Sequence, residues 1–468
     1  MANTYLERNI TSGSVGRTFT YSVWFKRSGI RNGSGAHTQL WNLSSDNDST
    51  KYIEIAIKNT DKLDMQFRNG TSGDNGTFLR RITNRVFRDP NAWYHLVLRF
   101  DSTQNSNDDR FRVYINGVQE TSFDLDGSSA TIPQNYVTDI ANNGGDHRIG
   151  RGAGSSSAYW DGSMSHFHFV DGVSYGPDTF GETDSTTGEW KIKTDPGISA
   201  SNYGTNGFWI LRNDNTGTDH SGNSHNLTVQ SGTLTNTEDC PDNVFCTLNP
   251  LDCDLVSGLS NGNNTFSGFN TGTDYSATSS TLSASSGKFY WEAKVTDLAE
   301  IDQVGVRLQN GVSMSIQGSN GSAGLQGTAY GGKSVQFSNG NKAGDGAQSA
   351  YMGGFSANDI IMVALDLDNN KITFGRNGQW SDGSGNANQT YANSTAAFTN
   401  LTAGEFYCPA QTSRSYGSNS GTTQYNFGNG YFGTTAISSE GTNASNIGKF
   451  EYDIPSGFTA LSTKGLNE

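Results

Sequence analysis

The stretch TFTYSVWFK, residues 18–26, decides the fold class of this chain. Aromatic and β-branched residues fill it, and Phe19, Tyr21, Val23 and Phe25 recur at every second position, which places them on one face of a strand. Comparable runs are YIEIAIK (52–58), YHLVLRF (94–100) and FRVYI (111–115). Each run predicts a half-buried antiparallel strand.

Glycine-containing pairs separate such runs. They include Asn69-Gly70, Asn116-Gly117, Asp161-Gly162 and Asn377-Gly378. Because glycine accepts the positive φ that two-residue hairpin turns require, each pair predicts a turn. No segment shows a sustained 3.6-residue apolar period bounded by caps, so we expect few and short helices. The fold class is therefore predicted as all-β, with two antiparallel β-sandwich or jelly-roll domains in tandem.

Length and composition bound the function. A chain of 468 residues exceeds what one core usually organises, which predicts two domains. The formal net charge of −14 argues against binding to nucleic acid, because that needs clustered Lys and Arg. Neither a basic start followed by an apolar run nor eighteen consecutive apolar residues occurs, so we expect no secretion signal and no membrane insertion.

The first half carries family-like motifs in a fixed order. FTYSVWFKRS (19–28), AWYHLVLRFD (92–101), RFRVYINGVQ (110–119) and TDHSGNSHNLT (218–228) together resemble the laminin-G-like, concanavalin-type jelly roll. That resemblance implies binding of glycans or proteins, in many members with calcium. The run from Gly150 through residues 169–193 to YGTNGFWI (203–210) is similar to virion proteins of tailed phages.

The second half resembles a SPRY domain, which implies a protein-interaction β-sandwich. The motifs are GKFYWEAKV (287–295), Val304-Gly305-Val306 and NDIIMVALDLDNNKITFGRNGQW (358–380). Asn358 departs from the family, which usually has Gly there. FCTLNPLD (245–252) and YDIPSGFTALSTKGL (452–466) resemble the edges of SPRY modules in phage virion proteins. We expect a laminin-G-like domain over 1–232, a connector over 233–242, a SPRY-like domain over 243–447 and a docking tail over 448–468.

The candidate catalytic motifs lack the secondary structure that their chemistry requires. Two carboxylates on alternate residues of one strand would suit glycoside hydrolysis, and Glu182, Asp184 and Glu189 come nearest. The Thr-Thr-Gly interruption breaks their alternation, so the segment is interpreted as a loop. GVSYG (172–176) and GLSNG (258–262) match a nucleophile-elbow pattern, but no helix is evident after either. We expect no catalytic residues and no enzyme activity.

Metal and cofactor patterns are incomplete. Asp366, Asp368 and Asn370 imitate an EF-hand start, but the later positions do not fit, and a strand hairpin is expected instead. Two acidic loop pairs, Asp46 with Asp48 and Asp108 with Asp109, could hold calcium or simply be solvated. His166 and His168 could form half a metal site, or a hydrogen-bonded buried pair. Cys240, Cys246, Cys253 and Cys408 lack zinc spacing and are interpreted as buried thiols. We expect no metal site and no cofactor, with calcium left open.

Aromatic residues beside turns are the candidate ligand contacts. Tyr159, Trp160 and Trp380 could stack on a sugar, with core or edge packing as the alternative. The resemblances imply a non-enzymatic phage virion surface protein, either a tail-fibre or adhesin subunit or a capsid or tail decoration subunit. Its expected partners are other virion proteins and a host surface glycan or receptor. We expect it to assemble in the host cytoplasm, as a homo-oligomer or in multiple copies per particle. A polysaccharide depolymerase and a free calcium-dependent lectin are the alternatives.

Overall fold

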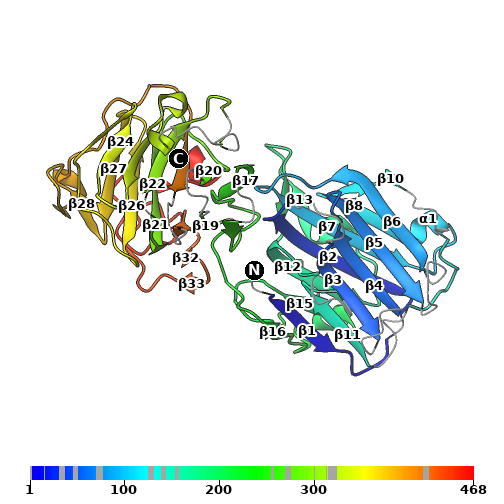
Figure 1. Ribbon diagram of the computed structural model, residues 1–468. Coiled ribbons are helices and arrows are strands. Elements are labelled where there is room, and N and C mark those ends of the chain that lie inside the picture. Colours follow the sequence, from blue (N-terminus) through cyan, green and yellow to red (C-terminus); the bar gives the residue numbers. More distant parts are fainter. Residues whose placement is uncertain are drawn as a thin grey trace. The chain divides into compact units, whose positions relative to one another are not determined.

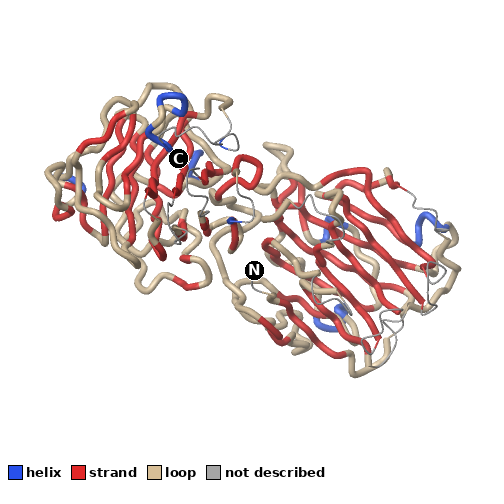
Figure 2. The backbone as a smooth tube through the Cα atoms, viewed as in Figure 1, coloured by secondary structure: helices blue, strands red, loops and turns tan. Residues whose placement is uncertain are grey.

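The computed structural model divides the chain into two compact units, Met1–Asn236 (unit 1) and Thr237–Glu468 (unit 2). Strands dominate both units, and helices are short (Figure 2). The residues that the structure describes are 3–14, 16–30, 37–45, 51–69, 77–124, 131–138, 144–152, 158–254, 258–268, 276–299, 301–312, 314, 324–414 and 421–468.

Unit 1 consists of two antiparallel sheets and a short hairpin (Figure 1). The eight-stranded sheet has the order β10 (Phe123–Asp124), β6 (Thr77–Val86), β5 (Lys62–Asn69), β4 (Lys51–Ile57), β3 (Thr38–Ser45), β11 (Gly145–Ile149), β1 (Tyr5–Asn9) and β16 (Thr228–Ser231). The six-stranded sheet has the order β15 (Phe208–Ile210), β12 (Gly162–Asp171), β2 (Thr18–Arg27), β7 (Trp93–Asp101), β8 (Phe111–Ile115) and β9 (Val118–Glu120). The hairpin joins β13 (Gly181–Thr183) to β14 (Trp190–Ile192).

The core of unit 1 lies between its two sheets. Phe19, on β2, stacks on Phe100 of β7 with ring centroids 4.9 Å apart, and it also contacts Phe67 of β5 and Trp41 of β3. All four side chains are fully buried. The alternation predicted for residues 18–26 therefore aims its aromatic face into the sandwich. Burial of side chains of this size supplies the main stabilisation of such a core.

The other face of β2 is buried as well, so the prediction of a half-buried strand is wrong here. Residues 173–203 lie over the six-stranded sheet on the side away from the core. Trp190 donates its indole N–H to Nδ1 of His95 on β7 at 2.9 Å, and the Tyr203 hydroxyl meets Nδ1 of His168 on β12 at 2.8 Å. His95 and His168 are at most 1% exposed. The polar residues at outward positions of these strands suggested contact with solvent, so the sequence pattern did not predict this second layer.

Unit 2 is also built from two main antiparallel sheets. The seven-stranded sheet has the order β17 (Leu248–Cys253), β20 (Ser276–Ser280), β30 (Tyr407–Arg414), β22 (Ile301–Leu308), β23 (Lys333–Gln336), β24 (Lys342–Gly344) and β25 (Ala347–Ser349). The nine-stranded sheet runs β18 (Leu259–Ser260), β19 (Thr265–Ser267), β31 (Thr422–Asn426), β21 (Lys288–Asp297), β26 (Ile360–Asp366), β27 (Lys371–Arg376), β28 (Gln379–Ser381) and β29 (Ala387–Gln389), with β34 (Thr459–Ala460) parallel to β21. A two-stranded piece pairs β32 (Tyr431–Phe432) with β33 (Thr435–Ala436).

The C-terminal segment of unit 2 packs on the outer face of the nine-stranded sheet. Phe450, Ile454 and Phe458 are buried in one cluster with Tyr290 of β21 and Trp380 of β28. The segment 448–468, expected as a docking tail, thus contributes its apolar side chains to unit 2. A docking role for it stays a prediction, and it would have to use the remaining exposed residues.

Turns and helices follow their local signals in part. Asn116 and Gly117 (φ 48° and 78°) and Asn377 and Gly378 (φ 51° and 83°) form the predicted hairpin turns. At Asp161-Gly162 the prediction is wrong, because Gly162 instead begins β12, where a Cβ would lie 2.1 Å from the Lys26 carbonyl oxygen. Asn69-Gly70 extends outside the described residues.

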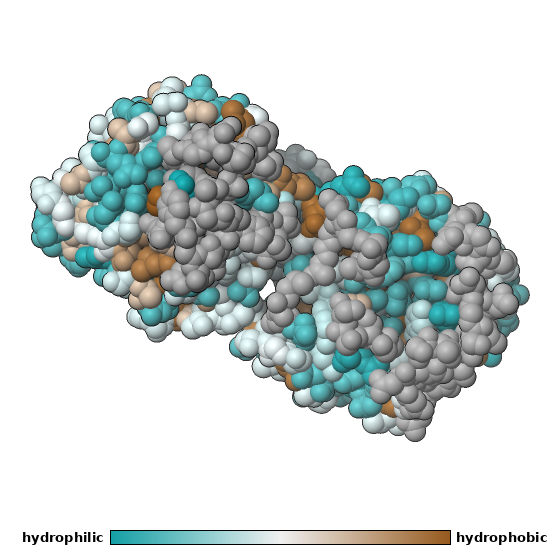
Figure 3. All heavy atoms as spheres, viewed as in Figure 1, coloured by the Kyte–Doolittle hydropathy of each residue, from teal (hydrophilic) through white to brown (hydrophobic). Residues whose placement is uncertain are grey.

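Helical pieces in the described chain are no longer than four residues. They are α1 (Asn107–Arg110), α2 (Ala200–Tyr203), and the 3₁₀ turns Pro177–Thr179, Gly324–Gln326, Thr328–Tyr330, Tyr391–Asn393 and Gly465–Asn467. None of these described helices has the length and hydrophobicity needed to span a bilayer. The described surface in Figure 3 is mostly hydrophilic, with scattered small hydrophobic areas.

Candidate functional site

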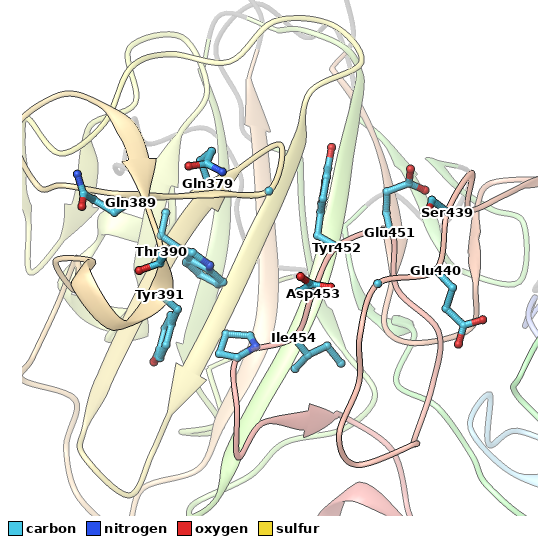
Figure 4. Close-up of a pocket in the computed structure, with 14 residues that line it drawn as sticks. Gln379, Gln389, Thr390, Tyr391, Ser439, Glu440, Glu451, Tyr452, Asp453 and Ile454 are labelled. Atoms are coloured by element: carbon cyan, nitrogen blue, oxygen red, sulfur yellow. The ribbon is translucent and has the colours of Figure 1, made fainter.

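A pocket of about 490 Å³ opens in unit 2 where the C-terminal segment meets the β28–β29 hairpin. Figure 4 shows Gln379, Thr390 and Tyr391 along one side, and Glu440 and Glu451 on the other. The volume lies within the usual range for sites that hold small ligands. Trp380, predicted as a ligand contact, is one of the lining residues.

Trp380 is held rigidly at this pocket. Its ring meets the rings of Tyr290 and Tyr391 edge-on, with centroids 6.3 and 5.0 Å away, and the residue is 4% exposed. Gly375 lies opposite it on β27, and a Cβ there would come within 3.2 Å of the indole. A glycine at that position therefore gives the indole its space. Most of the Trp380 indole therefore packs against neighbouring side chains, and only its edge is accessible to a ligand.

The opposite side of the pocket carries carboxylates that are fixed by short-range hydrogen bonds. Asp453 accepts from the backbone N–H and hydroxyl of Thr442 at 2.7 and 2.8 Å. These two donors lower the pKa of Asp453, so the carboxylate form is favoured. Glu451 accepts from the backbone N–H of Ser438 at 2.7 Å and from its hydroxyl. Both carboxylates are thereby oriented by these hydrogen bonds.

A buried glutamate underlies this wall. Glu292, on β21, is fully buried and accepts hydrogen bonds from the backbone N–H groups of Glu451 and Tyr452, both at 2.9 Å. Its two oxygens also accept from the Tyr290 hydroxyl at 3.0 Å and from the Asn426 amide at 3.2 Å. Burial raises the pKa of Glu292 to about 7, against the four donors that favour its charged form. This carboxyl sets the position of the pocket wall.

The other two predicted aromatic residues lie in unit 1 and are not among the residues that line this pocket. Trp160 packs edge-on against Phe25 of the core with a centroid distance of 5.8 Å. The Tyr159 ring lies beside that of Tyr5, and the guanidinium of Arg151 sits over both rings. The structure thus places both in packing contacts, and a ligand role for either stays a prediction.

The acidic residues considered for catalysis are engaged in a hairpin rather than the expected loop. Asp184 accepts from the backbone N–H groups of Thr186 and Thr187 and pairs with Lys191 at 2.8 Å, and these contacts lower its pKa. Glu182 lies 3.9 Å from Lys193. The Thr-Thr-Gly sequence forms the turn between β13 and β14, so local pairing overrides the interruption seen in the sequence.

The remaining sequence candidates have structural partners. In GVSYG the hydroxyl of Ser174 accepts from Arg99, and the motif leads into the three-residue 3₁₀ turn Pro177–Thr179. GLSNG contains the short strand β18. Asp366 accepts from Asn369 at the β26–β27 turn, which confirms the strand hairpin in place of an EF-hand.

The histidine pair is hydrogen-bonded and buried, as expected. The ring nitrogens Nδ1 of His166 and His168 meet the Ser165 and Tyr203 hydroxyls, both at 2.8 Å. His166 has a φ of 47° and interrupts the ladder between β12 and β2, so the two histidines do not simply alternate along a regular strand.

Metal-ligand clusters are absent from the part of the chain that the structure describes. Asp109 pairs with Arg112, whereas Asp46 and Asp48 lie outside the described residues. Among the cysteines, three are buried, namely Cys246, Cys253 and Cys408, whereas Cys240 is partly exposed. Burial raises the pKa of the Cys408 thiol to about 12, as expected for an inert core thiol.

Sequence reasoning missed most of the pocket. Glu451, Tyr452 and Asp453 come from the segment 448–468, and Glu440 comes from the stretch before it; the sequence did not predict that either part would form a pocket wall. One signal was present: Phe450, Ile454 and Phe458 recur at four-residue spacing within the supposed tail. Such buried aromatic and aliphatic residues indicate packing against a neighbouring element.

Comparison with known families defines the class of unit 1. Residues 2–174 match the family model described as Concanavalin A-like lectin/glucanases superfamily. Together with the two facing antiparallel sheets, this match supports a concanavalin-like, jelly-roll fold for the N-terminal part.

Solved structures provide further likenesses, and no curated protein matches the chain. The SPRY domain of human HERC1 is 18% identical, with 38% of this chain and 96% of that chain covered and a TM-score of 0.28. A human SPRY domain is 15% identical, with coverages of 35% and 90% and a TM-score of 0.24. A heptameric SAP-like pentraxin from Limulus polyphemus is 16% identical, with coverages of 37% and 72% and a TM-score of 0.25.

Proposed function

We propose that this chain is a non-enzymatic surface protein of a bacteriophage virion that acts through protein and glycan contacts. Motif order in both halves of the sequence supports the phage assignment. As a tail-fibre or adhesin subunit, or as a capsid or tail decoration subunit, it would be present in several copies and contact other virion proteins. Rigid sandwiches that present loops and rim pockets suit such a role.

The pocket around Trp380 is the observation that carries the binding role. It combines aromatic rings with side-chain amides and carboxylates, which is the composition that binds sugar rings and their hydroxyl groups. The aromatic residues are locked in place before a ligand arrives, so binding costs little ordering entropy. A host surface glycan is the ligand class that these groups fit.

The depolymerase alternative retains one supporting feature, because Glu440, Glu451 and Asp453 line the same pocket. Glycoside hydrolysis requires one carboxyl group to carry a proton at the start of the reaction. The lowered pKa of Asp453 disfavours that role for Asp453 itself. Release of reducing ends from a bound polysaccharide would establish the depolymerase and overturn the non-enzymatic proposal.

A glycan array probed with the purified full chain tests the binding role. We expect a signal that Gln379→Ala weakens, since Gln379 is an exposed lining residue whose loss leaves the core intact. Gln119→Ala on exposed β9 of unit 1 is the matched control and should leave the signal unchanged. Loss of signal with EDTA would favour the calcium-dependent lectin. Absence of the chain from purified particles of the phage that encodes it would overturn the virion assignment.

A further inference from the structure

The charge of the pocket restricts its ligand. Fourteen residues line it, and they include three carboxylates, on Glu440, Glu451 and Asp453, but no Lys, Arg or His. Two lysines lie near the lining residues, and each has its own acidic partner. Lys449 pairs with Glu238 at 2.7 Å, and Lys371 lies 3.7 Å from Asp366. Lys449 also lies within the field of Glu440 and offsets part of its charge, so the excess negative charge rests mainly on Glu451 and Asp453. An anionic ligand would be repelled by these carboxylates, whereas a cationic group would be attracted.

The negative field extends behind the lining. Tyr452, whose backbone N–H is held by the buried Glu292, has a pKa raised by its own burial and by the charges of Glu451, Glu292 and Asp359. Four carboxyl groups therefore lie at one side of the pocket, counting Asp453 beside Tyr452. Of these, Glu292 is only partly charged near pH 7, because burial raises its pKa to about 7. Their hydrogen bonds come from neutral donors, namely backbone amides, hydroxyls and side-chain amides. No cation among these donors neutralises them.

A second feature favours a ligand that also carries a hydrogen-bond acceptor. Trp380 is 4% exposed, and among the described residues its indole N–H forms no hydrogen bond. The indole nitrogen is not among the buried polar atoms that lack a partner, so it keeps contact with solvent, and an acceptor atom on a ligand could take the place of water there. Lysine and other simple ammonium groups carry only donors. A sugar hydroxyl both donates and accepts, and its ring can pack on aromatic side chains.

We propose that the pocket binds an amino sugar through its protonated amine, with the carboxylate of Asp453 facing the ammonium, the charges of Glu440 and Glu451 adding to the negative field, and Trp380 donating to a ring hydroxyl. This inference rests on the proposed glycan-binding function and specifies its ligand class. Neutral sugars would bind more weakly because they lack the ionic contact. Uronic and other acidic sugars would be excluded by repulsion from the carboxylates.

Calorimetric titration of the full chain with matched oligosaccharides tests this proposal. The probes are the β-1,4-linked glucosamine trimer, its fully N-acetylated counterpart and a glucuronate oligomer of similar length. We expect the glucosamine trimer to bind at least about tenfold more tightly than the acetylated trimer, the size expected for one charge-assisted contact. No binding of the glucuronate oligomer is expected. Binding of the glucosamine trimer should weaken steeply with added salt, since its source is ionic.

Glu440→Gln separates the charge from the shape of the pocket. Glu440 is exposed and its replacement is isosteric, so folding should be preserved. We expect this variant to lose about fivefold in affinity for the glucosamine trimer and less than twofold for the acetylated trimer. Glu405→Gln, at an exposed site of unit 2 outside the pocket lining, is the control.

The outcomes distinguish this inference from the proposed function. Equal binding of both trimers, or tighter binding of the glucuronate oligomer, overturns the amine proposal while leaving glycan binding in place. Failure of all three probes, together with a silent glycan array, overturns both. An unchanged affinity of Glu440→Gln for the glucosamine trimer likewise contradicts the ionic contact.

Discussion

Replacing Glu292 by Gln is the perturbation that most directly probes how the pocket wall is held. The carboxyl accepts four hydrogen bonds, two on each oxygen, from the donors of Glu451, Tyr452, Tyr290 and Asn426. Gln places an NH₂ group where one oxygen was, so two donors lose their acceptor. Each buried donor left without an acceptor costs about 1–3 kcal/mol, which gives roughly 2–6 kcal/mol before any compensation.

The compensation depends on pH. Burial raises the pKa of Glu292 from 4.5 to about 7, so the folded chain binds more protons than the unfolded chain within that window. The contribution of Glu292 to stability is therefore full below pH 4.5 and falls as the pH rises through 7. A shift of this size corresponds to roughly 3 kcal/mol, from about 1.4 kcal/mol per pKa unit. Gln has no such titration, so Glu292→Gln should be most destabilising near pH 4.5 and least above pH 7.

Hydrogen exchange of the full chain during urea unfolding, followed on unit 2 peptides by mass spectrometry, provides the assay. Following unit 2 peptides separately keeps the measured pH dependence free of the histidine titrations, because the histidines of the chain lie in unit 1. Tyr290→Phe, which removes one of the four donors, is the control and should cost about 1 kcal/mol. A deficit of Glu292→Gln that is larger at pH 8 than at pH 4.5 would refute the reasoning, because the four donors would then outweigh burial and lower the pKa.

Three further predictions concern packing and the burial of a titratable group. Gly378→Ala should lower the thermal stability of the chain more than Gly404→Ala does. Both glycines have a positive φ (83° and 79°), but only at Gly378 would an added Cβ contact Tyr452, at 3.1 Å. Equal losses of stability in the two variants would contradict this contact. Burial lowers the pKa of His95 to about 3, so unit 1 should lose stability as the pH falls from 6.5 toward 3, and the unfolding free energy of His95→Gln should show a weaker pH dependence. Trp190→Ala should cost about 3 kcal/mol in urea unfolding by uncovering the six-stranded sheet, and a loss under 1 kcal/mol would contradict a packed cover.

The strands were predictable because their signal is local. Alternation in residues 18–26 and the Asn-Gly pairs at 116 and 377 depend on a few neighbours only, and the structure follows them. The second layer on each sandwich was not predictable in this way. Outward positions such as His95 and Glu292 are polar, which locally indicates solvent, yet long-range cover segments bury them completely.

The candidate site shows the same division. Trp380 could be singled out from its place after a hairpin turn, because a turn presents its flanking side chains at a rim. The carboxylates of Glu451 and Asp453 could not, since their position depends on backbone hydrogen bonds to Glu292, more than 150 residues earlier in the chain. Tyr159, like Trp380, lies beside a predicted turn, but its ring packs beside that of Tyr5. The residues next to Tyr159 in the sequence do not predict this contact with a residue far away in the chain.

Hydrogen exchange of the full chain, with and without the glycan that gives the strongest array signal, tests the central claim that the unit 2 pocket binds the ligand. The account predicts slowed exchange at residues 379–391 and 438–455, with Gln379→Ala reducing the effect. Protection confined to unit 1 peptides, with residues 438–455 unchanged at saturating glycan, would contradict it.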